Sequence, residues 1–370
     1  MLAVGVYAYH ETGSAFVVTL LTMLRVLPMA MFGAFVGAAA DIVEGRIVLL
    51  LSTLTLLGTS ATVALLAYMD HLAIWHLGVA SFISGTMWST DIPLRRLMMG
   101  RVVGADRMAH AMVFDVGSSN ASRMAGPAIG GAVLITWGID GCFVLGAAMY
   151  LVAISAAAGI GYRSPSSSNP VLLLKNVLDA MEMVRREKHL MGILAITVIF
   201  NLFGWPNLSL IPVIGRDNLS LDPRAVGLLA SMEGMGAIAG VLTIYYLGKP
   251  AYHARLYICS VMLYLAALMI FAVLPSASQA GAALFITGLA GSGFGIMQST
   301  LAFRSVEPQM RARMLGLLSV SIGTGPLGFL QVGLLAEAIG AQLAIVTTSA
   351  EGMIALVLTR RLWQEIRNEP

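Results

Sequence analysis

Five ionisable side chains fall deep inside long apolar stretches of this 370-residue chain, where charge is otherwise avoided. Charged groups at such depth in a bilayer are costly, so they mark transport pathways or paired structural sites. Burial disfavours the ionised form of a carboxylate, which lets a buried acid bind and release a proton near neutral pH. Glu233 is therefore our first candidate for handling a proton and Asp115 our second. The other three are Arg25, Arg123 and Glu351.

Glycine and proline follow Arg123 in the segment NASRMAGPAIGG. Glycines let another helix approach closely, and a proline removes one backbone hydrogen bond and leaves a bend point. This composition suits the joint of a transporter that rocks, although it also suits a static pair of packed helices. A similar segment, GPLGFL, occurs about 200 residues later and indicates a parallel repeat of two six-span halves. The residues of these two motifs are Gly126, Pro127, Gly130, Gly131, Gly325 and Pro326.

The elements that must position these residues are membrane-spanning helices. Hydrophobic residues make up 58% of the chain and charged residues only 11%, which excludes a soluble globular protein. Apolar runs of about 20 residues recur along the whole length, and each is long enough to cross a bilayer. We predict an all-α polytopic membrane protein with eleven full spans, at residues 14–40, 46–68, 72–94, 108–137, 139–161, 190–214, 223–247, 252–274, 278–302, 314–338 and 341–360.

Two stretches fall outside these spans. Residues 1–10 look like the end of another span but are too short to cross a bilayer alone. Residues 162–189 begin as a Ser/Pro-rich linker and continue with apolar residues at helical spacing between basic ones, which favours a helix on the membrane surface. We therefore predict an N-terminal bundle at 1–161, a cytoplasmic linker at 162–189 and a C-terminal bundle at 190–370.

Lysine and arginine give the orientation. If the hairpin after the first full span is cytoplasmic, 18 of the 22 basic residues fall in cytoplasmic segments. Only Arg216 and Arg224 fall on the opposite side. We therefore expect a multi-pass protein of the cell membrane with a cytoplasmic C-terminus. The net charge of +3 reflects this asymmetry, so we expect no nucleic-acid partner.

Four segments resemble the major facilitator superfamily, in particular its branch of enterobactin exporters and macrolide efflux proteins. GAAADIVEGR resembles the superfamily's Gly-x-x-x-Asp loop motif through Gly37, Asp41 and Arg46, although Ile42 stands where a basic residue is usual. Residues 89–131 are similar to the region of spans four and five, 220–240 to span eight, and 311–328 to span eleven. The resemblance implies two six-helix bundles with most of the first helix missing here.

The same resemblance implies roles for particular residues. The segment Gly126–Gly131 matches a fifth-span signature associated with exporters. Spans five and eight of the superfamily face each other across the two halves, so we expect an ion pair between Arg123 and Glu233 at that interface. Structural pairing of each arginine within its own half is the alternative, and for Arg25 the favoured one. Asp41 is expected to contact the start of the eleventh span, where Arg311 and Arg313 lie.

We therefore expect a secondary active transporter, in which protons drive the efflux of small amphipathic molecules, of the drug or siderophore class, by alternating access. The alternatives are an importer of a small solute and a transport-inactive membrane sensor or scaffold. No nucleotide-binding Gly-Lys-Ser/Thr loop and no zinc-protease helix occur, so we expect no enzyme and no cofactor. We expect a monomer whose partners are the bilayer, protons and a small-molecule substrate.

Several polar and aromatic residues are further candidates. Trp88 and Trp205 would stack on an aromatic substrate, or belong to an interfacial aromatic belt. Asp70, His71 and His76 gather at one loop, but their spacing suits no usual metal site, and we predict none. The residues that we expect to line a substrate cavity are Trp88, Asn201, Trp205 and Gln298.

Overall fold

The computed structural model describes residues 1–42, 45–159, 188–247, 252–306 and 311–367, and all regular structure in these ranges is helical. The linker predicted at 162–189 lies outside them, apart from its last two residues. Helices are what a bilayer requires, because every backbone N–H and C=O of a lipid-exposed segment must be satisfied within that segment.

Four helical elements build the first bundle: α1 (Leu2–Thr12), α2 (Ala15–Ile42), α3 (Gly45–Tyr68) and α4 (Ile74–Ala158). The short α1 packs into a small apolar core of this bundle, where Ala8 is fully buried. Residues 1–10 are thus helical and packed, as the end of a span would be.

The 85-residue α4 is not straight. Arg95 Nη2 lies 3.0 Å from Asp115 Oδ1, although 20 residues of straight helix would span about 30 Å. A second reversal occurs at Gly138, whose φ of 72° lies in the left-handed region that favours glycine. Across this reversal the Cys142 thiol donates to the Gly130 carbonyl at 3.6 Å. The element therefore crosses the bundle three times, which matches the spans predicted at 72–94, 108–137 and 139–161.

The second bundle begins with an irregular span. Pro206 and Pro212 lack a backbone donor, and around them the helix changes between α, 3-10 and π geometry. The span consists of α6 (Lys188–Ile199), η2 (Phe200–Gly204), η3 (Trp205–Leu210), α7 (Ile211–Val213) and η4 (Ile214–Asn218). The helices that follow are α8 (Pro223–Leu247), α9 (His253–Val273), α10 (Ala277–Arg304), α11 (Arg311–Ile322), α12 (Gly325–Ile339), α13 (Ala341–Leu358) and α14 (Arg360–Arg367).

Each of the eleven predicted spans coincides with helical structure. Eight helical segments in the described residues are long and apolar enough to cross a membrane, and a shorter apolar one covers Ala15–Met31. One of the eight, Phe114–Ala158, contains the reversal at Gly138 and so provides two crossings. The predicted fold class, an all-α polytopic membrane protein built of two helical bundles, is confirmed.

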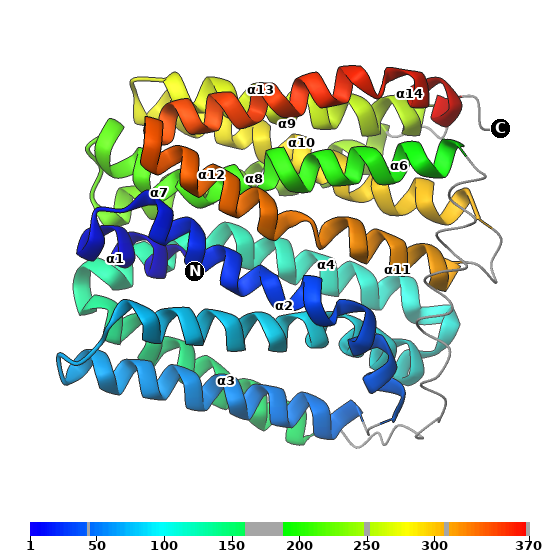
Figure 1. Ribbon diagram of the computed structural model, residues 1–370. Coiled ribbons are helices and arrows are strands. Elements are labelled where there is room, and N and C mark those ends of the chain that lie inside the picture. Colours follow the sequence, from blue (N-terminus) through cyan, green and yellow to red (C-terminus); the bar gives the residue numbers. More distant parts are fainter. Residues whose placement is uncertain (43–44, 160–187, 248–251, 307–310, 368–370) are drawn as a thin grey trace.

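The two ends of the molecule differ in their residues. The starts of α3 and α6, together with α14, lie at one end, which we call the basic end because Arg46, Lys188 and Arg360 lie there (Figure 1). The turn after α3 and the turn at Gly340 lie at the opposite end, which we call the turn end (Figure 1). The helices therefore alternate in direction as the span order predicts.

Candidate functional site

The two bundles meet along α4 and α8, where backbone approaches backbone. A Cβ added to Gly131 would overlap the carbonyl oxygen of Pro223, and one added to Gly227 would overlap the carbonyl oxygen of Pro127. Only glycine fits at such distances, because any side chain would force the helices apart. The prediction that the motif after Arg123 brings a second helix close is therefore confirmed for Gly131.

An ion pair crosses this same interface. Arg123 Nη2 lies 2.5 Å from Glu233 Oε1, so the predicted pair is present. A Cβ added to Gly234 would lie 2.7 Å from the Arg123 carbonyl oxygen, so the backbones are in contact beside the pair. The Glu233 side chain is only 11% exposed, whereas that of Arg123 is 54% exposed. The carboxylate is thus enclosed between the bundles, while the guanidinium reaches it from a more open side.

The remaining motif residues behave differently from the expectation. A Cβ added to Gly126 or Gly130 would meet nothing within 4 Å, so these two glycines serve no close helix contact. Pro127 lies within the continuous helical structure of α4, and the bend expected there stays a prediction. In the second half, by contrast, the helix is interrupted at Gly323 and Thr324, and Gly325 and Pro326 form the first turn of α12.

A second contact between the bundles runs along α2 and α12. A Cβ added to Gly333 would overlap the hydroxyl of the buried Thr19. A Cβ added to Gly323, just before α12, would lie 3.2 Å from the Cα of Ala30. Thr19 thus lies against Gly333 and Ala30 against Gly323, so residue numbers rise along α2 as they fall toward the start of α12. The two helices are therefore antiparallel.

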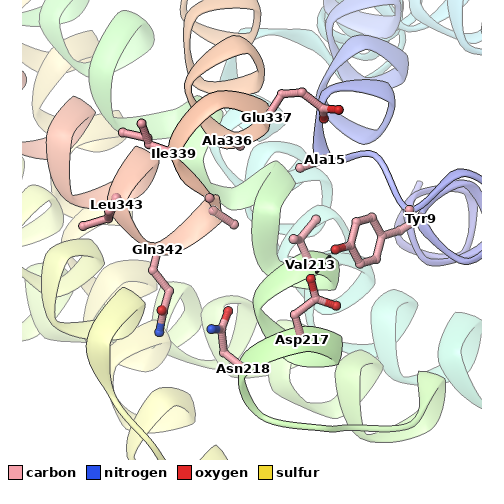
Figure 2. A pocket seen from close by; sticks show the side chains of 13 residues that line it. Tyr9, Ala15, Val213, Asp217, Asn218, Ala336, Glu337, Ile339, Gln342 and Leu343 are labelled. Carbon is pink, nitrogen blue, oxygen red and sulfur yellow. Dashed lines mark hydrogen bonds between the residues drawn. The ribbon is translucent and has the colours of Figure 1, made fainter.

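Polar contacts continue this α2–α12 contact at the turn end. The Tyr9 hydroxyl donates to the Asp217 carboxylate, and the Ser14 hydroxyl donates to Glu337 Oε2 at 2.9 Å. Both hydrogen bonds join the first bundle to the second. They border a polar pocket of about 370 Å³, into which Figure 2 shows Tyr9 and Asp217 directed. None of these four residues was among the sequence candidates.

The other predicted charges have partners of their own. Asp115 pairs with Arg95, whose Nε also lies 3.7 Å from Asp91 Oδ2, so this cluster belongs to the first bundle. Glu351 accepts a hydrogen bond of 2.5 Å from Gln331, within the second bundle. Their proposed transport roles remain predictions.

Arg25 is held by an aromatic ring. Its guanidinium carbon lies 5.6 Å from the centre of the Trp88 ring, a cation–π arrangement. Among the described residues its buried Nε has no hydrogen-bond partner. A Cβ added to Gly85 would overlap the Arg25 carbonyl oxygen, so α2 and α4 touch at this level. This placement within one bundle agrees with the structural alternative for Arg25.

The residues predicted to line a cavity lie in two groups. Trp88 lies in the first bundle, against Arg25. Asn201 and Gln298 are buried in the second bundle, where Asn201 donates to the Thr197 carbonyl at 2.8 Å and Gln298 to the Thr197 hydroxyl at 3.0 Å. In the same bundle, the ring of Trp205 packs edge-on against an aromatic ring of α12. Their role in binding a substrate remains a prediction.

Three loop candidates have structural partners. Arg46 donates to the Ala158 carbonyl at 2.7 Å and so joins the start of α3 to the end of α4. At the turn end, His71 Nδ1 lies 2.6 Å from the Met69 carbonyl, and His76 Nδ1 accepts from the Ala73 amide at 2.9 Å. Neither histidine contacts Asp70 in the described hydrogen bonds and ion pairs.

The loop-motif residues Gly37 and Asp41 lie near the end of α2, which contacts α11. The surroundings of Gly37 and the side chains of Asp41, Arg311 and Arg313 lie outside the described part of the structure. The contact predicted for Asp41 therefore stays a prediction.

Residues 10–367 match the model of a protein family described as transmembrane secretion effectors. The chain belongs to this family of major facilitator transporters. Macrolide efflux protein A of Streptococcus pyogenes is 22% identical over 350 residues, which cover 92% of this chain and 85% of that protein. Macrolide efflux protein A of Enterococcus faecalis is 21% identical over 315 residues, covering 82% and 96%.

Solved structures support the major facilitator fold. The crystal structure of a mutant of the nucleoside transporter NupG aligns with a TM-score of 0.78 at 14% identity, covering 98% of this chain and 94% of that one. The resemblance to the macrolide-efflux branch of the superfamily is thus confirmed. The family is one of membrane transporters and not of enzymes.

The sequence predictions missed the two glycines of α8 that contact α4, although their spacing could have revealed them. Gly227 and Gly234 lie seven residues apart in α8, a spacing that places both on one helix face. Both contact α4. In a membrane helix, small residues repeated on one face indicate a packing surface.

Proposed function

We propose that this transmembrane secretion effector is a secondary active exporter, in which protons drive the efflux of small amphipathic molecules by alternating access. The observation that carries the proposal is the Arg123–Glu233 pair, which joins the two bundles beside close backbone contacts of α4 with α8. A pair placed there makes the relative position of the bundles depend on the charge of one carboxylate.

Protonation of Glu233 would weaken this ion pair. When Glu233 binds a proton it loses its charge, and the attraction to Arg123 weakens, because a neutral carboxyl group offers only a hydrogen bond. The contact of α4 with α8 then loses one of its holding interactions, and the bundles can rock. Loss of the proton restores the pair, so each cycle of rocking is tied to one proton.

Relatives and charge distribution support the direction of transport and the class of substrate. The two bacterial relatives are named as macrolide efflux proteins, which favours an exporter of amphipathic compounds. The concentration of arginine and lysine at the basic end favours a cytoplasmic location for that end and for the C-terminus. We also propose the division into bundles at 1–161 and 190–370, joined by a cytoplasmic linker.

The test is transport by the purified protein in proteoliposomes, with erythromycin and ethidium as probes, under an imposed pH gradient. We expect Glu233→Gln to abolish gradient-driven efflux while exchange of probe down its own gradient persists. The matched control is Glu11→Gln, which neutralises an exposed carboxylate whose described hydrogen-bond partner is the adjacent His10. Full gradient-driven efflux by Glu233→Gln would refute the proton role, and uptake in place of efflux would establish an importer.

A further inference from the structure

Two carboxylates of the second bundle reach across to the first bundle at the turn end. Asp217 lies in η4 and accepts a hydrogen bond from Tyr9 in α1. Glu337 lies in the last turn of α12 and accepts a hydrogen bond of 2.9 Å from Ser14, just before α2. The two carboxylates therefore hold two consecutive helices of the other bundle.

Glu337 is placed at the start of α2. The first amides of a helix lack partners within the helix, and a negative charge near them is favourable. Ser14 acts as the capping residue, because its hydroxyl accepts from the Val17 amide at 3.3 Å. Glu337 Oε2 accepts from that same hydroxyl and, at 3.5 Å, from the Phe16 amide. The cap of a first-bundle helix is thus completed by a charge from the second bundle.

Tyr9 is held in a similar way. Its hydroxyl donates to Asp217, and the guanidinium of the preceding residue, Arg216, lies 5.7 Å from the centre of its ring. Both groups come from the same π-helical turn of the second bundle. The end of α1 is therefore gripped by one short segment.

A close steric contact lies one turn below these polar ones. Gly333 admits the Thr19 hydroxyl against the backbone of α12, and Thr19 is fully buried. Above it, the pocket of about 370 Å³ lies between the two bundles, with Tyr9 and Ala15 on its first-bundle side and Asn218 and Gln342 on its second-bundle side (Figure 2). The polar contacts thus lie at the turn end of the interface between the bundles, and the close Thr19–Gly333 contact lies one turn deeper.

We propose that Asp217 and Glu337 form a latch that holds the turn end of the transporter closed, by gripping Tyr9 and the start of α2. The inference rests on the proposed alternating access, since only a bundle that moves needs a latch. The Ser14–Glu337 contact is exposed to solvent, where single hydrogen bonds are weak enough to break in every cycle. The latch is distinct from the proton site, because neither carboxylate contacts Arg123 or Glu233 in the described structure.

A distance measurement tests the latch without any transport. Spin labels are attached to cysteines placed at His71 and Ser278, exposed residues of the two bundles at the turn end, after Cys142 and Cys259 are replaced by serine. The protein is studied in lipid nanodiscs by double electron–electron resonance. We expect the Tyr9→Phe/Glu337→Ala variant to raise the population with the longer label distance by about threefold or more.

The matched control changes a tyrosine and a glutamate that both lie in α1, the helix of Tyr9. Tyr7→Phe/Glu11→Ala removes the same groups, and among the described hydrogen bonds and ion pairs Glu11 is joined only to His10. We expect its distance distribution to equal that of the parent. Equal distributions for parent and latch variant would overturn the proposal, as would an equal shift in the control.

A crosslink tests the same latch in a folded, active protein. Cysteines placed at Ser14 and Glu337 are joined by a short reversible thiol crosslinker before transport is measured. We expect transport to fall about tenfold or more on crosslinking and to return on reduction. Undiminished transport by the crosslinked protein would refute the latch. Failure of the proton role of Glu233 would leave both latch results unaffected, so the two proposals can fail separately.

Discussion

Two Gly-Pro segments lie at two of the contacts between the bundles, and the chain differs between them. In α4 the helix runs unbroken through Gly126 and Pro127, and the charge pair with Glu233 lies beside it. At the matching place in the second half the helix stops at Gly323 and starts again at Gly325. The first segment thus lies within helical structure packed against α8, whereas the second divides a span into two pieces against α2.

Under the proposed alternating access, this difference would separate two tasks. The α4–α8 contact combines an unbroken helix, fitted glycines and an enclosed carboxylate, which suits control by a proton. The α2–α12 contact combines a divided span, a steric seal and polar contacts at its end, which suits opening and closing. Similar sequence motifs therefore do not imply similar local structure, because the packing of a glycine or proline depends on the neighbouring helix.

The largest expected effect is on the glycine contact of α4 with α8. Gly227→Val should destabilise the protein by about 2–3 kcal/mol and abolish transport, because the side chain overlaps the Pro127 carbonyl. Thermal unfolding in detergent and proteoliposome transport measure both effects. Gly130→Val is the matched control, since an added Cβ there meets nothing within 4 Å. Equal losses in the two variants would show that helix propensity, and not the interface, is responsible.

The second effect concerns the charge pair. Arg123→Met leaves the enclosed Glu233 carboxylate without its partner and should destabilise by about 2 kcal/mol. The figure lies below that for a fully buried pair, because the arginine side chain is 54% exposed. Adding Glu233→Met to Arg123→Met should recover much of the loss. Thermal unfolding of the parent, both single variants and the double variant gives the coupling, and additive losses would contradict it.

The smallest effect is expected at the start of α2. Glu337→Ala removes an exposed helix-capping charge and should lower stability by only about 0.5–1 kcal/mol. Ser14→Ala should cost about 1 kcal/mol, because it removes the cap itself. Thermal unfolding of the two single variants and of the double variant measures this. A loss on Glu337→Ala as large as that of Arg123→Met would remove the contrast between a gate contact and a structural ion pair.

Sequence reasoning identified the spans because an apolar run of about 20 residues has few other uses. It identified the Arg123–Glu233 pair because charge at mid-depth is rare and the superfamily resemblance placed spans five and eight together. It could not separate Gly131 from Gly126 and Gly130, since each residue turns the helix by about 100° and the direction of the partner helix is set by tertiary packing. Tyr9, Ser14, Asp217 and Glu337 gave no signal, because polar residues near the ends of spans are common.

We expect α2 to turn about the contact between Ala30 and Gly323. This contact lies where the span formed by α11 and α12 is divided, and Ser14 lies about 24 Å away toward the start of α2, counted at 1.5 Å per residue. If α2 turns about that contact, the part of the helix between Ala30 and Ser14 acts as a lever whose free end contacts Glu337. A rotation of about 10° would carry Ser14 about 4 Å away from the carboxylate, beyond hydrogen-bonding reach, while Ala30 and Gly323 barely move. Under the proposed alternating access, a rotation that leaves the packing at Ala30 in place would therefore separate the two bundles at the turn end.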